Sequence, residues 1–308
     1  MKTLAQVFGA VSFILLVCWI VGGVISDRWI WSQWFDWIPT LVVLFLLCLT
    51  STLFFYNKRN VLGSTFVLCT VLLFVWFTTV EHRLFMNSSN PSDIKLVGWT
   101  MSHSKGMVAK ESAEYIVQLD ADITLLTHGW KVRGEEIIRT WLGENGHKVI
   151  NSQFTLLTKF EPMKVQTLIA SDEIFVSSFK LDTSKVLGEP LVLWAVDLPS
   201  SLWNSKMAIA KRVQHFLNEI DVELPDIVIG DFNMSRNSVS IQSMFPTLYN
   251  VADTVGIGAL ASYPMEFPLI HIDHVLFNTT ITPTYYELIN PHIGRHRIQV
   301  VEFGSTPK

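Results

Sequence analysis

Cysteine is rare in this 308-residue sequence and unevenly placed. Its three cysteines, Cys18, Cys48 and Cys69, all lie in long apolar runs near the N-terminus, and none follows them. Because disulfides and thiol nucleophiles need this residue, the sequence excludes both from residue 92 onward. Internal repeats, low-complexity tracts and long runs of like charge are lacking as well.

Charged residues are also few, at 16% of the chain, against 49% apolar residues and a mean hydropathy of +0.35. The apolar excess is concentrated in the first 80 residues. After Arg83 the chain carries 18 basic and 24 acidic residues, so this part is net acidic. Affinity for nucleic acid comes mostly from Lys and Arg on phosphates. Nucleic acid therefore stays open as a partner but is not favoured.

Three apolar runs, each about 19 to 22 residues long and free of charge, account for the high hydropathy: Leu4–Ile25, Ile38–Tyr56 and Val61–Val80. This is the length that a helix needs to cross about 30 Å of hydrocarbon. The first run is too long for the apolar part of a signal peptide, and two more follow it. Residues 1–83 are therefore predicted to form a three-helix membrane anchor. The absence of ionisable side chains inside the runs argues against a transporter.

The connections between the runs indicate how the anchor is oriented. Four tryptophans crowd residues 29–37 of the first connection. Because Trp is enriched at the headgroup level, we expect this segment to lie along the membrane surface. Lys2 precedes the first run, and Lys58 and Arg59 lie in the second connection. By the positive-inside rule these cations are cytoplasmic, and the region after the third run lies on the opposite side.

Residues 84–92, rich in Ser and Asn, are predicted to be a linker to a second domain, 93–308. In that domain short apolar runs alternate with polar turns and amphipathic patterns, which predicts a layered α/β sandwich with mixed sheets. The predicted strands are Lys95–Trp99, Ile123–Leu126, Phe154–Leu157, Ile174–Phe179, Leu191–Val196, Ile227–Ile229, His274–Phe277 and Ile298–Phe303. The predicted helices are Ala109–Leu119, Glu135–Trp141, Ser205–Ile220 and Val239–Met244.

Polar side chains recur where these strands begin or end. The run DIVIGDFNMSR, residues 226–236, reads as a buried strand that stops at Asp231 and Asn233. Asp273 opens one strand and His296 precedes the last, while Asp197 and His128 follow two others. Strand ends at one edge of a sandwich converge in space, so we expect these side chains to share a pocket.

These motifs resemble the endonuclease/exonuclease/phosphatase family, the metal-dependent phosphodiesterases related to DNase I. GDFN (230–233) is that family's strongest short signature, and IDHVLFN (272–278) is similar to its second. LDADITLLTHGW (119–130), VDLPSS (196–201) and GRHRIQVVEF (294–303) stand in the family's order and spacing. Three helices before such a domain resemble a bacterial membrane-anchored subgroup. The resemblance implies a DNase I-like four-layer α/β sandwich, preceded by three transmembrane helices in a bacterial inner membrane.

The resemblance also implies the chemistry of the site. Family members hydrolyse phosphoesters with Mg²⁺ or Mn²⁺ on the scissile phosphate. Carried over by position, Asp231 and Asn233 orient the attacking water and a phosphate oxygen. Asp273 orients His296, which supports the phosphate or a proton transfer. These four residues are the predicted catalytic set, and a phosphate-containing molecule is the expected substrate or ligand.

Four positions depart from the family pattern: Thr100 replaces an Asn, His128 a Glu, Asp197 a His and Arg295 an Asp. In one interpretation the metal site is rebuilt from His128, Asp197 and Asp231 for Mn²⁺, Fe²⁺ or Zn²⁺. Arg295 and Thr100 then bind the substrate. In the other, hydrolysis is lost. The sequence therefore predicts a membrane-anchored, metal-dependent phosphoester hydrolase with an altered metal site, or an inactive binding or sensing module of the same fold outside the cytoplasm.

Overall fold

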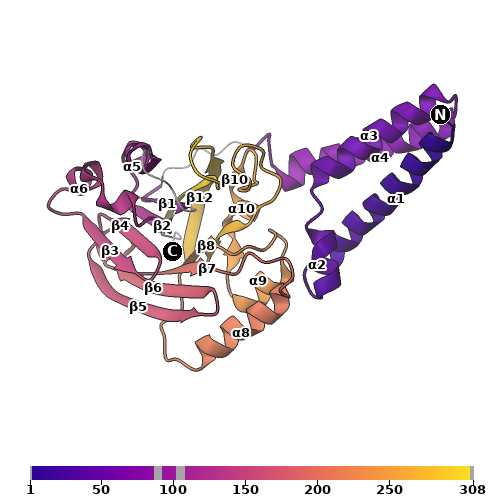
Figure 1. Ribbon diagram of the computed structural model, residues 1–308. Coiled ribbons are helices and arrows are strands. Elements are labelled where there is room, and N and C mark those ends of the chain that lie inside the picture. The colour runs from indigo at the N-terminus through magenta and orange to yellow at the C-terminus, as the bar shows by residue number, and fades with distance from the viewer. Residues whose placement is uncertain (1, 87–91, 102–107, 306–308) are drawn as a thin grey trace.

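The N-terminal part of this computed structural model is a set of apolar helices (Figure 1). The structure describes residues 2–86, 92–101 and 108–305; residues 87–91 of the predicted linker lie outside these ranges. The N-terminal elements are α1 (Lys2–Ile25), α2 (Ile30–Asp36), α3 (Thr40–Tyr56), α4 (Asn60–Trp76) and a π-helical turn, η1 (Phe77–Glu81).

Two of these helical segments, Lys2–Ile25 and Asn60–Glu81, are long and apolar enough to cross a membrane. The third predicted span is α3, which forms a pair with α2 bent by 64° and counts as a span when the pair is taken as one. The described helices therefore provide two or three membrane spans. Leu47, Leu44 and Leu73 form the centre of their shared core. Toward its C-terminal end α1 diverges from α3 and α4 (Figure 1).

Two mixed sheets form the second part of the molecule. The seven-stranded sheet has the order β10-β12-β13-β1-β2-β4-β3, and the six-stranded sheet has the order β5-β6-β7-β8-β11-β9. The strands of the first are β1 (Ile94–Thr100), β2 (Ile123–Thr127), β3 (His147–Asn151), β4 (Phe154–Thr158), β10 (Gly256–Ile257), β12 (Ile281–Ile289) and β13 (Ile298–Ser305). Those of the second are β5 (Pro162–Ser171), β6 (Ile174–Leu181), β7 (Leu191–Asp197), β8 (Ile227–Asp231), β9 (Tyr249–Asn250) and β11 (Asp273–Phe277).

Three apolar cores separate four layers, as predicted. The largest core lies between the two sheets and includes Leu96, Phe179 and Phe303. A second core joins the six-stranded sheet to α8 (Lys206–Asn218) and α9 (Val239–Met244). A third joins the seven-stranded sheet to α5 (Val108–Leu119) and α6 (Glu136–Leu142). The remaining short helices are η2 (Val132–Gly134), α7 (Ser184–Leu187) and α10 (Val251–Thr254).

The sequence analysis missed several strands that have few fully buried side chains. β3 and β5 each lie at one edge of their sheet, and most of their side chains are half-buried or exposed. β12 contains Pro283 and pairs irregularly with β13 there. Such strands lack the continuous apolar run that marks a strand buried on both faces. A proline in the run further weakens the pattern.

The connection between the first two apolar runs packs against the sandwich. Buried Asp27 accepts a hydrogen bond from the backbone N–H of Ser240 at 3.1 Å. The amide of Gln33, also buried, donates to the Leu202 carbonyl at 2.7 Å, and its oxygen accepts from the Lys206 N–H at 3.1 Å. This segment, predicted to lie along the membrane, is therefore also an interface with the second part of the chain.

Gly230, inside the GDFN motif, allows β7 and β8 to approach each other. The strands run parallel with Val196 opposite Gly230. A Cβ atom at residue 230 would lie 1.9 Å from the Val196 carbonyl oxygen, and the Gly230 φ of 150° is one that L-residues rarely adopt. Any side chain at this position would push apart two strands that carry site residues.

Gly230→Ala is therefore expected to lower the free energy of unfolding by about 3 kcal/mol, because the overpacking is against backbone. Gly134→Ala is the control, since a Cβ there meets nothing within 4 Å. Urea unfolding of the full chain in detergent, followed by near-UV circular dichroism, measures both. Equal stability of the two variants would contradict this account of the strand contact.

Candidate active site

A cleft of about 650 Å³ opens at the edge where several strands of both sheets end. Seven of the eight predicted site residues line it: Thr100, His128, Asp197, Asp231, Asn233, Arg295 and His296. The eighth, Asp273, is 1% exposed and contacts two of the lining residues. The structure therefore brings all the predicted residues together, from positions far apart in the sequence.

Strand register explains why three aspartates meet at this edge. Asp231, the last residue of β8, is paired with Asp197 on parallel β7 and with Asp273 on antiparallel β11. The three carboxylates thus lie in one row across the six-stranded sheet. Because β7 runs parallel to β8 and β11 runs antiparallel to it, the ends of β7 and β8 and the start of β11 lie at the same edge of the sheet.

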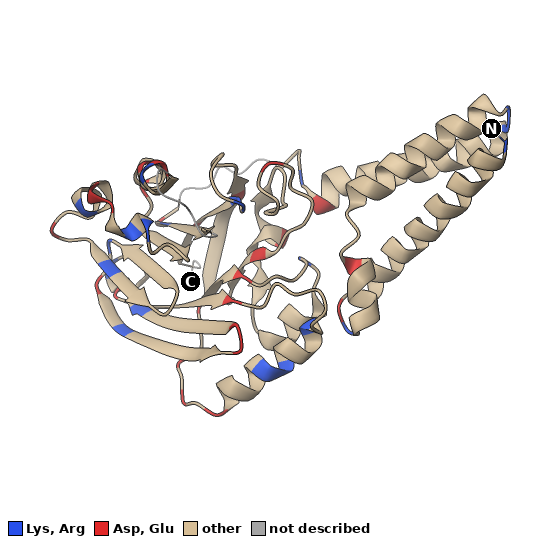
Figure 2. Cartoon of the chain, in the orientation of Figure 1, with Lys and Arg blue, Asp and Glu red and all other residues tan. Residues whose placement is uncertain are grey.

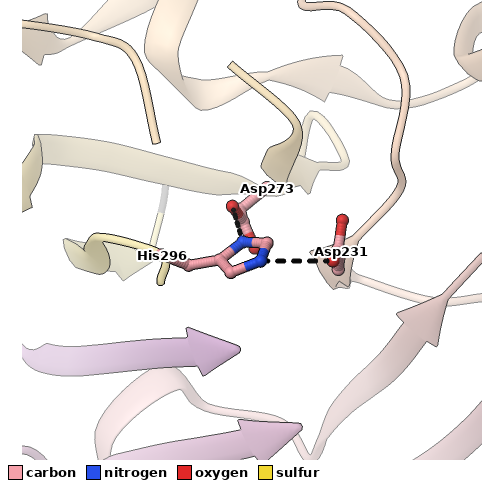
Figure 3. Close-up of side chains that lie close together, drawn as sticks. All are labelled: Asp231, Asp273 and His296. Carbon is pink, nitrogen blue, oxygen red and sulfur yellow. Dashed lines mark hydrogen bonds and ion pairs between the residues drawn. The ribbon is translucent and has the colours of Figure 1, made fainter. Parts of the chain in front are cut away.

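Asp273 and His296 form a buried ion pair at the back of the cleft (Figure 3). His296 Nδ1 lies 2.9 Å from Asp273 Oδ2, and the Thr100 hydroxyl donates to Asp273 Oδ1 at 2.7 Å. Burial opposes charge on His296, but the charge and hydrogen bond of Asp273 raise its pKa to about 9. Burial likewise works against the Asp273 carboxylate, yet His296 keeps the pKa of Asp273 below its usual value. His296 is therefore an imidazolium at neutral pH.

Asp231 faces His296 across the cleft, with 4.0 Å between Asp231 Oδ2 and His296 Nε2 (Figure 3). Burial, followed by the charge of Asp273, raises the pKa of Asp231 well above its usual value, although His296 opposes this. Asn233 adopts a left-handed backbone (φ 50°), and its N–H donates to Asp231 Oδ1 at 3.0 Å. The Asn233 side-chain amide donates to the Leu198 carbonyl at 2.8 Å, which fixes it in the cleft wall.

His128 and Asp197 form a second pair on the other side of Asp231. His128 Nε2 lies 3.1 Å from Asp197 Oδ2. The side-chain amide of Gln153 also donates to Asp197, and the His128 N–H donates to the Gln153 carbonyl at 2.9 Å. Gln153 lies in the β3–β4 turn and was not predicted as a site residue. The residues around Gln153 in the sequence form no motif, so its place in the site became evident only from the fold.

Arg295 is held at the cleft rim by Tyr263, another residue that the sequence analysis missed. The Arg295 guanidinium donates to the Tyr263 hydroxyl at 2.6 Å and lies 5.6 Å from the centre of that ring. The same ring packs against His296, with 5.1 Å between ring centres. Tyr263 thus contacts both Arg295 and His296, two of the basic side chains that line the cleft.

Among the residues that the structure describes, one group of three side chains brings possible ligand atoms for a divalent metal close together. The ligand atoms of Asp231, Asp273 and His296 lie within 4.8 Å of one another. Metal ligands must be deprotonated, however, and the raised pKa of His296 and the bonds of Asp273 work against this set. The predicted set of His128, Asp197 and Asp231 does not converge as closely: His128 Nε2 lies 3.1 Å from Asp197 Oδ2, and Asp197 is paired with Asp231 in strand register. An imidazole with two carboxylates suits Mn²⁺, Fe²⁺ or Zn²⁺ better than Mg²⁺.

His271 and His274, which lie beside the site in sequence, belong to the interior rather than to the metal-ligand sets. Their rings stack with 4.7 Å between centres. His274 Nε2 lies 2.9 Å from the Met234 carbonyl, so it donates there, and Nδ1 accepts from Asn250 at 3.0 Å. Burial lowers the pKa of both histidines, that of His274 to about 4. They are neutral packing groups beneath the cleft.

No protein-family model matches the chain, and no curated protein matches its sequence. Solved structures do match it. The endonuclease/exonuclease/phosphatase from Bacteroides vulgatus has a TM-score of 0.51 at 13% identity, over 69% of this chain and 99% of that one. A mannosyl-6-phosphatase from Bacteroides thetaiotaomicron has a TM-score of 0.52 at 12% identity, over 68% and 99%.

TDP2 from D. rerio, complexed with a single-strand DNA product, has a TM-score of 0.52 at 12% identity, over 69% of this chain and 99% of that one. The similarity therefore extends over nearly the whole of each of these three proteins. It confirms the fold that the motifs predicted. The sandwich of this chain has the DNase I-like α/β fold of the endonuclease/exonuclease/phosphatase proteins.

Proposed function

We propose that this chain is a membrane-anchored, metal-dependent phosphoester hydrolase with an altered metal site. One observation carries the proposal: Asp231 and a buried, Asp273-bound His296 face each other across 4.0 Å of one cleft. A carboxylate beside an imidazolium can activate a water while the imidazolium stabilises negative charge on a phosphate oxygen in the same cleft. The fold, shared with a phosphatase and with a protein bound to a DNA product, supports the same reaction class.

In this mechanism Asp231 accepts a proton from the attacking water. Asp231 lines the cleft beside His296, within reach of a water bound there. The Asn233 amide, held by the Leu198 carbonyl, orients the water or a phosphate oxygen. The Nε2–H of the His296 imidazolium hydrogen-bonds a non-bridging phosphate oxygen, and its charge stabilises the transition state. The bond from phosphorus to the leaving oxygen breaks as the bond to water forms, and the leaving oxygen takes a proton from bulk water. Asp273 and Thr100 touch no substrate in this account; they position His296.

The altered metal site of this proposal consists of His128, Asp197 and Asp231. A divalent ion bound there would neutralise negative charge on the phosphate. Arg295, at the position where the family has a carboxylate, binds a phosphate oxygen with the edge of its guanidinium that Tyr263 does not use. A small or lipid phosphoester suits the acidic sandwich better than bulk DNA does.

A second candidate function is a binding or sensing module without hydrolysis. Two contacts favour it: His128 pairs with Asp197, and Arg295 bonds to Tyr263. Two carboxylates that the family usually has as metal ligands are replaced here by His128 and Arg295. A cation at position 295 also repels a metal nearby. This function requires a phosphate-bearing ligand to bind without turnover.

The proposed location of the sandwich is outside the cytoplasm, on a bacterial inner membrane. Lys2 begins α1, and Lys58 and Arg59 connect α3 to α4. Figure 2 shows basic residues at the end of the helices that points away from the sandwich. Since cytoplasmic ends of membrane helices are enriched in Lys and Arg, this arrangement supports a cytoplasmic N-terminus and a sandwich on the opposite side.

Asp231→Asn is expected to reduce hydrolysis of bis(p-nitrophenyl) phosphate, a soluble phosphodiester, by about 10²- to 10⁴-fold, because it removes the general base. The rate is measured for the full chain in detergent with Mn²⁺. Asp221→Asn, an exposed carboxylate before β8, is the control and should keep the wild-type rate. An unchanged rate in Asp231→Asn would rule out the proposed mechanism. Binding of the diester by the wild type without any turnover would favour the second function.

His128→Ala is expected to weaken Mn²⁺ or Zn²⁺ binding at least about tenfold, because it removes the only imidazole of the proposed set. Calorimetric titration of the full chain in detergent measures the affinity. His215→Ala, on the exposed face of α8, controls for adventitious surface binding. Equal affinities of the two variants would show that the metal, if bound, does not use His128.

A further inference from the structure

A second cavity, of about 360 Å³, lies between the N-terminal helices and the sandwich. It occupies the space where α1 has diverged from α3 and α4 (Figure 1). We call it the wedge cavity. Its lining includes Trp19, Gly23 and Val24 of α1, Trp76 of α4, Val80 of η1 and Ile270 of the sandwich. Its volume is in the range of ligand-binding pockets.

The polar groups on the wall of the wedge cavity bond mainly to one another. Trp19 Nε1 donates to the Thr40 hydroxyl at 3.1 Å, and that hydroxyl donates to Glu81 at 2.6 Å. Asp36 accepts from the Ser235 hydroxyl. Arg236 and Asp253, which also line the cavity, pair with each other at 2.6 Å. These polar groups are thus partnered, and indole, aliphatic and glycine surface makes up much of the remaining lining. An occupant matched to such a lining is apolar.

The wedge cavity adjoins the catalytic cleft. Ile270 lines both cavities. Two consecutive residues of the first connection separate them, because Trp37 lines the cleft while Ile38 lines the wedge cavity. The two cavities are thus neighbours, and a molecule with a polar head and an apolar chain is the kind of ligand that would occupy both. The N-terminal part of the chain contributes Trp37, which follows α2, to the lining of the cleft itself.

Tryptophans place the mouth of the cleft at the level of lipid headgroups. Trp203, 77% exposed, follows Pro199, Ser200 and Leu202, which line the cleft. Its ring packs on Trp34 of α2 at 4.9 Å between centres. Exposed indoles at the end of apolar helices are typical of the interface between hydrocarbon and water. The loop that lines the cleft thus lies against α2.

We propose that the wedge cavity holds a hydrocarbon chain of a membrane lipid whose phosphate lies in the catalytic cleft. The substrate class is then a lipid phosphoester, taken directly from the bilayer. The identity of the phosphate as the reacting group rests on the proposed hydrolase function, whereas occupation of the wedge cavity by the chain does not. The N-terminal helices act in this account as part of the binding site as well as an anchor.

Photo-crosslinking tests chain binding without any need for turnover. The full chain is placed in vesicles of phosphatidylethanolamine and phosphatidylglycerol that contain phosphatidic acid with a diazirine in its acyl chain. After illumination, adducts are mapped by proteolysis and mass spectrometry. We expect adducts on residues 269–271, which belong to the sandwich and line the wedge cavity. Adducts confined to the apolar helices would overturn the proposal.

Gly23→Leu should block the wedge cavity without disturbing the helix. A Cβ on Gly23 meets nothing within 4 Å, and Gly23 lines the cavity, so the larger side chain has room to fill it. We expect loss of the adducts on residues 269–271. Ile14→Trp, at a position of α1 that is 61% exposed, is the control and should keep them. Retention of these adducts in Gly23→Leu would contradict the proposal.

Hydrolysis assays separate this proposal from the hydrolase function. Gly23→Leu should lose activity on phosphatidic acid or phosphatidylglycerol but keep activity on bis(p-nitrophenyl) phosphate, which has no chain. Asp231→Asn should lose both activities and keep the adducts. Adducts on residues 269–271 without turnover of any of these compounds would refute the hydrolase function and leave the lipid site standing. Equal loss of both activities in Gly23→Leu would overturn the lipid assignment.

Discussion

The buried carboxylate of Asp273 is the constraint on which the site depends. It begins β11 in the six-stranded sheet, whereas two of its side-chain donors, Thr100 and His296, end β1 and precede β13 in the seven-stranded sheet. One negative charge therefore ties the sheets together at the edge where the cleft opens. A buried carboxylate persists only when it is paired and hydrogen-bonded. The same bonds that stabilise this edge also hold His296 charged and aimed at Asp231.

The parts of the structure that local sequence determines were predictable. Buried strands are recognisable as apolar runs. The polar residues beside them, such as Asp231 at the end of β8 and His296 before β13, follow from the motifs. Gln153 and Tyr263 were not predictable, because they reach the site from turns without a pattern and their roles exist only through long-range packing. The packing of residues 27–36 against the sandwich was not predicted from the sequence for the same reason, because its contacts join positions about 170 to 210 residues apart.

That packing changes the relation between anchor and site. Gln33 fixes the Leu202 carbonyl and the start of α8, and Trp37 lines the cleft beside them. The fully buried ammonium of Lys206 bonds the Pro199 carbonyl at 2.8 Å and lies 6.0 Å from the Trp37 ring centre. Gln33 and Trp37 of the first connection therefore help to fix the conformation of residues 199–206. The first connection therefore packs against the sandwich and contributes Trp37 to the lining of the cleft.

The most direct test of the account is kcat for a chainless phosphodiester in the wild-type full chain and in Asp273→Asn. The substitution keeps the size of the side chain and removes the charge that orients His296. The account predicts turnover by the wild type and loss of most of kcat in the variant, with far-UV circular dichroism unchanged. Equal kcat in the two folded proteins would contradict the claim that the Asp273–His296 pair supports hydrolysis.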